Sequence, residues 1–138
     1  MAVVKSDQED NIYTKFLAAR KVSAYTIKIC SNQKIFLPEF KGAVVDDLIE
    51  TAKRIFIDAW EANDIRVETA QDWEDRERLE RSSIRACNRL LALMQIAKTV
   101  YHLRSSKIKY WGELTKTARE DLKTWHTGDK KRYPKVVG

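Results

Sequence analysis

Four arginines share one short stretch of the chain, RLERSSIRACNR, at spacings of three, four and four residues. They are Arg78, Arg81, Arg85 and Arg89. In an α-helix these spacings bring the side chains to one side, within an arc of about 80°. The planar guanidinium group suits bidentate contacts with phosphate or carboxylate groups and stacking on bases. The pattern therefore predicts an exposed basic ridge about 16 Å long, at ~1.5 Å per residue.

Two interpretations of this ridge remain open from the sequence. Like charges four residues apart oppose helix formation, and no acidic residue follows Glu80 at helical spacing to offset Arg85 and Arg89. In one interpretation the arginines form salt bridges with the acidic face of the preceding helix. In the other they bind phosphate groups or an acidic surface of a partner protein.

A second group of basic residues lies near the C-terminus. It consists of Lys123, Lys130, Lys131 and Arg132. These side chains are candidates for contacts with a phosphate backbone, with Tyr133 available for stacking on a base. A disordered tail that only improves solubility is the alternative for this group.

The distribution of charge along the chain favours an anionic partner. The 138 residues carry a net charge of +6, and the isoelectric point is about 9.3. Residues 1–75 hold 10 basic and 14 acidic residues, whereas residues 76–138 hold 16 and 6. The excess of basic residues in the second half suggests nucleic acid, an acidic protein face or an anionic membrane surface as partner. Solubility alone is the other explanation.

Motifs of catalysis and metal binding are missing from the sequence. It contains no nucleophile elbow, no P-loop and no dinucleotide-binding glycine pattern. His102 and His126 have no carboxylate or cysteine at metal-ligand spacing, and the Glu-x-x-His pairs of di-iron bundles do not occur. We therefore expect a protein that is not an enzyme and that binds no metal or cofactor.

The cysteines and the apolar segments indicate a cytoplasmic protein. Cys30 and Cys87 show no CxxC spacing, and both fall beside apolar positions of expected helices. They are expected to be reduced, buried thiols. The N-terminus lacks the apolar run of a signal peptide, and no segment approaches the ~18 apolar residues of a membrane span.

Hydrophobic periodicity predicts four helices in a single domain. With only 4 Gly and 2 Pro, the chain has few of the turns that a β-sandwich needs. We expect helices over residues 7–31, 38–63, 72–103 and 107–125, with Pro38 in a first turn, Asp72 as a cap and Gly128 ending the last helix. These predict an antiparallel up-and-down four-helix bundle over residues 1–128 and a short basic tail over 129–138.

The second expected helix carries two adjacent apolar stripes, which make an unusually wide face. The second stripe consists of Val45, Ile49, Phe56 and Trp60. Two neighbouring helices of the same bundle can cover such a face. Alternatively, this stripe packs against another subunit, because an exposed apolar patch of this size is unusual on a monomer.

Several segments together resemble a known family. They are IYTKFLAARKVSAYTIK, the turn IFLPEFKG, the helix DDLIETAKRIFIDAWEAN, the arginine-led RLERSSIRACNRLLALMQIAKTV, KYWGEL and LKTW. Over residues 10–127 the chain resembles the Avd proteins, the accessory variability determinants of diversity-generating retroelements. These are similar in fold to the intervening-sequence proteins encoded in some bacterial 23S rRNA genes. Glu39 departs from the family, which tends to have a basic residue after the proline.

The resemblance implies a function as well as a fold. It implies a homopentameric barrel without catalysis that binds the retroelement reverse transcriptase and nucleic acid, template RNA or cDNA, in support of mutagenic reverse transcription and retrohoming. It implies that the ridge arginines face the polymerase or the template RNA. An intervening-sequence-type bundle, or another basic oligomeric adaptor that binds RNA, is the alternative. Either would act in the cytoplasm of a bacterium, encoded by its genome or by a phage.

Overall fold

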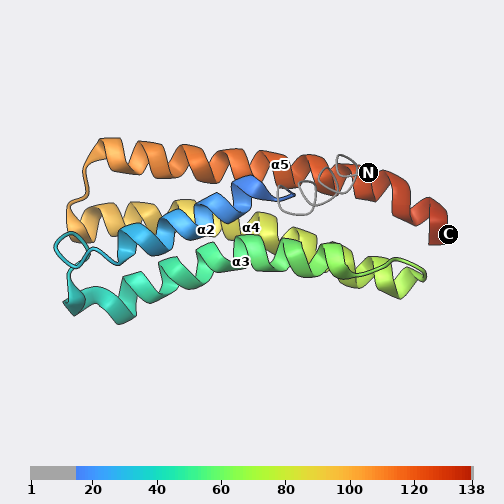
Figure 1. The fold of residues 1–138 in the computed structure, drawn as a ribbon, viewed down its shortest axis with the longest axis horizontal. Coiled ribbons are helices and arrows are strands. Elements are labelled where there is room, and N and C mark those ends of the chain that lie inside the picture. The colour runs from blue at the N-terminus through green and yellow to red at the C-terminus, as the bar shows by residue number, and fades with distance from the viewer. Residues whose placement is uncertain (1–14, 138) are drawn as a thin grey trace, which may run out of the picture.

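Four helices pack together around one core in the computed structural model of the protein, which describes residues 15–137 (Figure 1). The helices are α2 (Leu17–Cys30), α3 (Asp46–Asp64), α4 (Ala70–Tyr101) and α5 (Ser105–Val137). No strand occurs among these residues. The predicted all-helical fold with four packed helices is therefore confirmed for the described part of the chain.

Helix α4 is the element against which both α3 and α5 pack, while α2 packs against α3 and α5. The core contains Leu48 and Ile55 of α3, Leu90 and Met94 of α4, and Trp111 of α5, all essentially inaccessible to solvent. The indole nitrogen of Trp111 donates a hydrogen bond to the hydroxyl of Thr26, 2.9 Å away. This arrangement leaves the outer side of α4, between α3 and α5, open to solvent.

The helical segment before α3 begins at Pro38, as the sequence predicts. It starts as a 3₁₀ turn, η1 (Pro38–Phe40), and continues as a π-helical segment, η2 (Lys41–Val45). Proline suits a first turn because its missing N–H would have no partner there. The α-helical part therefore begins only at Asp46.

The N-terminus of α4 is closed by a capping box rather than by Asp72 as the cap. Thr69 is the N-cap, and its hydroxyl accepts a hydrogen bond from the backbone N–H of Asp72. The Asp72 carboxylate accepts in return from the backbone N–H groups of Glu68 and Thr69, each at 3.0 Å. These hydrogen bonds lower the pKa of Asp72. The predicted N-cap was therefore wrong by three residues, because Asp72 is the N3 residue of the capping box and Thr69 is the N-cap.

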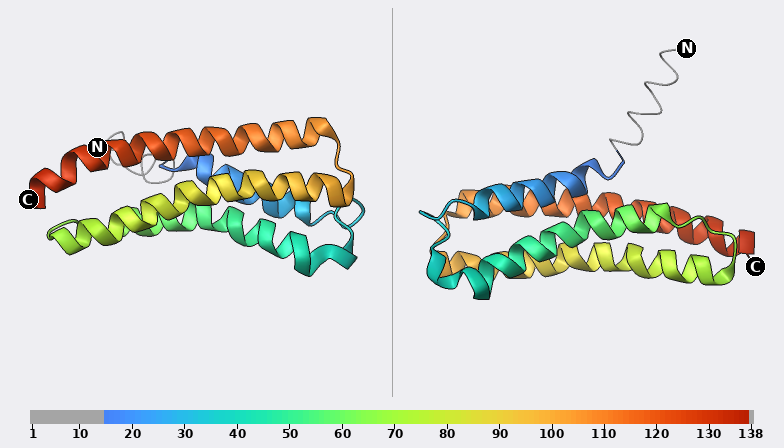
Figure 2. Two further views of the ribbon diagram at one scale, coloured as in Figure 1. Left: turned by 180° about the vertical axis from the view of Figure 1, so that it is seen from behind. Right: turned by 60° about the horizontal axis from the view of Figure 1, so that its bottom comes forward.

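Helix α5 does not end at Gly128. It continues to Val137 and includes Pro134, so the predicted basic tail is part of this helix as far as the structure describes it. The end of α5 lies beside the connection between α3 and α4, as views from two further directions show (Figure 2). Tertiary contacts of Asp129, described below, override the local preference of glycine to end a helix.

Helix α2 packs one side against α3 and α5. Its predicted start at Asp7 lies outside the described residues, and Phe16 at the N-cap has a left-handed backbone conformation with φ 62°. The first residue of α2 is therefore Leu17. The buried side consists of Ala19, Val22, Ser23, Thr26 and Cys30.

Two further expectations concern the cysteines and the membrane. Cys30 and Cys87 are free and buried, and burial raises the pKa of each thiol to about 12. Within residues 15–137, none of the helices has the length and apolar character needed to cross a bilayer.

Candidate nucleic-acid interface

A groove of about 1000 Å³ runs along the outer side of α4 and is bordered by α3 and α5. We call it the basic groove, and its seven cationic residues are Arg54, Arg78, Arg81, Arg85, Arg89, Lys123 and Lys130. Only two carboxylates, those of Asp47 and Glu50, belong to its lining. The groove therefore concentrates positive charge from three helices on one surface.

Hydrogen bonds between α3 and α4 fix the position of the ridge. The hydroxyl of Ser83 donates to the carbonyl oxygen of Ile55, and the neighbouring Ser82 donates to the carboxylate of Asp58. Both serines lie between Arg81 and Arg85 in the sequence. Because these short side chains hold the two helices together at this point, the arginines of the ridge remain at the outer side of α4.

The ridge arginines have weak local partners or none. Arg78 lies 3.3 Å from Asp75 and Arg81 lies 3.4 Å from Glu77, yet their side chains are 74% and 60% exposed. Exposed pairs of this kind contribute little to stability. The Nε of Arg89 donates to the hydroxyl of Thr51 at 3.3 Å. Arg85 makes no ion pair with any residue between 15 and 137.

The interpretation of the ridge as a salt-bridge face against α3 is wrong. In the described part of the chain, no ion pair joins a ridge arginine to a carboxylate of α3. Instead, Asp58 accepts from Ser82, and Glu50 pairs with Arg54 of its own helix at 3.3 Å. The positive charge of the ridge is therefore left largely free for an external anion.

The predicted C-terminal cations divide into two groups. Lys123 and Lys130 line the basic groove, together with His126, which lies 3.1 Å from Glu77. Lys131 is exposed but does not line the groove. Arg132 pairs with the buried carboxylate of Asp129 at 2.7 Å.

Tyr133 is not free for stacking on a base. Its ring packs against Trp73, with the ring centroids 5.6 Å apart, and the guanidinium groups of Arg76 and Arg132 each lie 4.9 Å from its centroid. Of the C-terminal candidates, Lys123 and Lys130 alone belong to the groove.

The residues predicted to contact another subunit also divide. Val45 is only 5% exposed and belongs to the core of its own bundle, so its assignment to a subunit interface is corrected. Ile49 and Phe56 are half-buried against the same core. Trp60 is 47% exposed and packs beside Phe56, with their ring centroids 5.6 Å apart. Trp60 is the member of this stripe with the most surface available to a partner.

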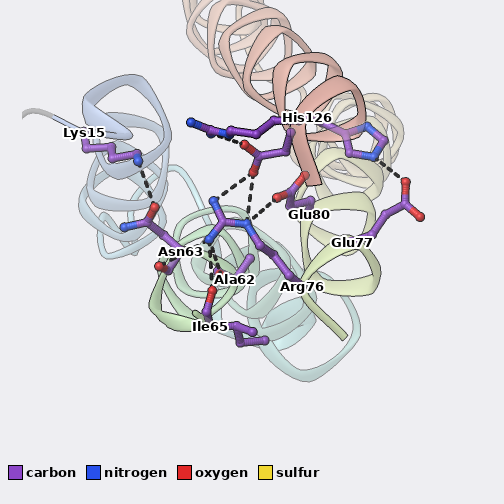
Figure 3. A network of polar contacts seen from close by, with 10 residues as sticks. Lys15, Ala62, Asn63, Ile65, Arg76, Glu77, Glu80 and His126 are labelled. Carbon is purple, nitrogen blue, oxygen red and sulfur yellow. Dashed lines mark hydrogen bonds and ion pairs between the residues drawn. The ribbon is translucent and has the colours of Figure 1, made fainter. Parts of the chain in front are cut away.

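Arg76 of α4 occupies the centre of a buried ionic cluster (Figure 3). Its Nε donates to Glu80 and to Asp129, each at 3.0 Å, and its Nη2 donates to Asp129 at 2.8 Å. Its Nη1 donates to the carbonyl oxygens of Ala62 at 3.3 Å and Ile65 at 3.2 Å, at the C-terminal end of α3. We call Arg76, Glu80 and Asp129 the Arg76 cluster.

The two carboxyl groups of the Arg76 cluster differ in protonation. Burial, and then the hydrogen bond and charge of Asp129, raise the pKa of Glu80 to about 9 despite the nearby Arg76. For Asp129, burial acts upward, but hydrogen bonds from Glu80, Arg132 and Arg76 outweigh it and lower the pKa. At neutral pH, Glu80 is thus a neutral acid and Asp129 is the anion that pairs with Arg76.

Sequence reasoning missed this cluster, although a signal for it exists. Arg76 and Glu80 continue the alternating three- and four-residue spacing of Ser83, Cys87 and Leu90, which are buried in α4. Charged residues on the buried stripe of a helix indicate a buried ion pair, because an unpaired charge there is very costly. Asp129 could not be added to the pair, since it lay beyond the expected end of the helix.

No group of three potential metal ligands occurs within residues 15–137. Comparisons of the chain with family models, curated proteins and solved structures give no significant match.

Proposed function

We propose that the protein is a non-enzymatic accessory protein whose basic groove binds the phosphate backbone of RNA or DNA. The observation that carries this proposal is the composition of the groove, in which seven cations from three helices face two carboxylates. An unbalanced surface of this kind attracts polyanions and releases their counterions on binding.

The spacing of the ridge favours a repeating anion over a single acidic site. Arg81, Arg85 and Arg89 follow one another at four-residue steps, so their rise along the helix axis is about 6 Å per step. A nucleic-acid strand presents its phosphates at regular intervals and can meet such a row with successive groups.

The lining of the groove also favours binding through the backbone rather than through the bases. No Phe, Tyr or Trp belongs to it, whereas proteins that stack on single-stranded bases use such rings. We therefore expect binding that tolerates many sequences and weakens steeply with salt.

The wider role in this proposal rests on the resemblance to the Avd proteins. In this wider proposal, the chain is an up-and-down bundle that assembles into a homopentamer, with Trp60 and Phe56 at a subunit contact. The pentamer serves a retroelement reverse transcriptase. A reverse-transcriptase gene and a template/variable repeat pair beside the gene for this chain would support that role. Their absence would favour an intervening-sequence-type or other RNA-binding adaptor. A clean monomer by native mass spectrometry at micromolar concentration would remove the pentamer.

The groove is tested by charge reversal of three ridge arginines. We expect Arg81→Glu, Arg85→Glu and Arg89→Glu together to abolish binding of a fluorescein-labelled oligouridine, measured by anisotropy, because they replace three largely unneutralised cations by anions. The helical circular dichroism should be retained, because all three residues are exposed. Arg81 and Arg89 each lose one hydrogen bond, to Glu77 and Thr51 respectively.

A matched control separates the groove from net charge. The variant Lys28→Glu, Lys34→Glu and Arg104→Glu changes the charge by the same amount at exposed residues outside the groove. It should bind the oligouridine more weakly only to the small extent that long-range attraction is lost. Equal loss of binding in both triple variants would mean that the groove is not the binding surface.

A further inference from the structure

The part of α5 beyond Gly128 is helical although its sequence favours helix only weakly. Gly128 has the lowest helix propensity after proline, and Pro134 removes the N–H that would bond to the carbonyl of Lys130. Between residues 126 and 135, Asp129 is the one fully buried side chain, and most of its neighbours are exposed. Tertiary contacts must therefore hold this segment in place.

These contacts converge on Arg76. Asp129 accepts two hydrogen bonds from the Arg76 guanidinium and one from Arg132. Tyr133, one turn further along α5, packs on Trp73 and lies against the same guanidinium. Arg76 in turn bonds to the carbonyls at the end of α3, so one side chain joins the ends of three helices.

Glu80 contributes to the shape of this cluster but not to its charge. It is completely buried, and its Oε1 has no hydrogen-bond partner among residues 15–137. Burial of a carboxylate oxygen that receives no hydrogen bond disfavours the charged form, in agreement with the pKa of Glu80 raised to about 9. Gln at this position would therefore preserve the size and the neutral state of the side chain.

Asp129 and the cations of the groove lie on different sides of the same helix. Lys123, His126 and Lys130 line the groove at spacings of three and four residues, whereas Asp129 points inward to Arg76. Because consecutive residues are about 100° apart around a helix, anchoring Asp129 fixes the direction of Lys130. If the helix ended at Gly128, this direction would be lost.

We propose that Asp129 is a positioning residue for nucleic-acid binding: its ion pair with Arg76 keeps α5 helical past Gly128 and so holds Lys130 at the basic groove. The inference rests on the proposed function of the groove. It assigns to a buried carboxylate, which cannot itself attract a phosphate, a part in binding phosphate.

The test compares Asp129→Asn with Lys130→Ala in the full chain. Each should raise the Kd for oligouridine at low salt roughly 5- to 10-fold and lower the slope of log K against log salt by ~0.7, the loss of one phosphate contact to a single strand. The double variant should bind no more weakly than either single one. Hydrogen exchange should become faster beyond residue 128 in Asp129→Asn and stay unchanged in Lys130→Ala.

Three further variants make the outcome independent of a folding defect. Tyr133→Ala removes the packing on Trp73 but leaves the ion pair, and should loosen the same segment more mildly. Gly128→Ala, which meets no atom within 4 Å of the added carbon, should restore part of the lost affinity when combined with Asp129→Asn. Glu80→Gln should bind oligouridine like the wild type at neutral pH.

The possible results are distinguishable. Unchanged Kd and salt slope in Asp129→Asn, with faster exchange beyond residue 128, would overturn this inference while leaving the groove intact. A wild-type protein that fails to bind oligouridine would instead overturn the proposed function itself.

Discussion

Arg76 and Arg85 belong to the same helix, yet they are placed in opposite environments. Arg76 is 4% exposed, and its guanidinium donates to two carboxyl groups and to backbone carbonyls. Arg85 is exposed, lines the basic groove and makes no ion pair with the described residues. In the Arg76 cluster the positive charge is paired with carboxyl groups of the same chain, whereas the basic groove has an excess of positive charge exposed to solvent.

This contrast separates structural arginines from arginines available for binding. A buried guanidinium must have its partners within the fold, because removing it from water is costly. An exposed one loses little by remaining unpaired. The Arg76 cluster should therefore determine stability, and the groove should determine affinity. Each prediction below tests one side of that division.

The largest expected effect is on stability, from Arg76→Met. The change leaves Asp129 as a buried carboxylate with Arg132 as its remaining ion-pair partner among residues 15–137, and the carbonyls of Ala62 and Ile65 lose a donor. Breaking a buried pair in this way costs about 3–5 kcal/mol of the free energy of unfolding. Urea denaturation of Arg76→Met and of Arg85→Met measures it, and the second change should stay within about 0.5 kcal/mol of the wild type. Similar losses for both would abolish the distinction.

The next effect concerns the pH dependence of stability and Glu80→Gln. With its pKa raised from 4.5 to about 9, Glu80 binds a proton in the folded chain that the unfolded chain has released. The free energy of unfolding therefore falls as pH rises across this window. Asp129, whose pKa is lowered from 3.8, titrates at lower pH than this window and does not contribute to the change. Gln cannot titrate, so the stability of Glu80→Gln relative to wild type should increase from pH 5 to pH 9. Urea denaturation at both pH values checks this, and a constant difference would contradict it.

The smallest effect is that of a single ridge arginine, Arg85→Ala. Arg85 has no ion pair to lose, so the free energy of unfolding should change by no more than about 0.5 kcal/mol. The affinity for oligouridine should fall because one phosphate contact is lost. The slope of log K against log salt should be lower by ~0.7. Anisotropy titrations at several salt concentrations measure both. A loss of stability without a loss of affinity would mean that Arg85 has a structural role, like Arg76, and does not bind phosphate.

The elements with strong local signals could be predicted from the sequence. The arginine spacing identified an exposed ridge, and hydrophobic periodicity indicated four helices. Pro38 correctly marked the start of the helical segment before α3. These features depend on periodicity and on residue-specific backbone preferences, which act within a few residues along the chain.

What could not be predicted depends on contacts between distant segments. Gly128 is a good local stop signal, but tertiary contacts override it, among them the pairing of Asp129 with Arg76, 53 residues away. On α2, the apolar side chain of Ile27 is 40% exposed, while the polar Thr26 is buried and accepts a hydrogen bond from Trp111. Propensity and pattern give way where tertiary contacts are stronger.

The central claim is that the ridge of α4 binds phosphate groups, and the salt dependence of binding tests it most directly. Oligouridine affinity should be measured over a salt series for the wild type and for the variant Arg81→Ala, Arg85→Ala and Arg89→Ala. At ~0.7 per phosphate contact to a single strand, the slope of log K against log salt should fall by about 2 in the variant. An unchanged slope would show that these arginines do not meet the nucleic-acid backbone and would contradict the claim.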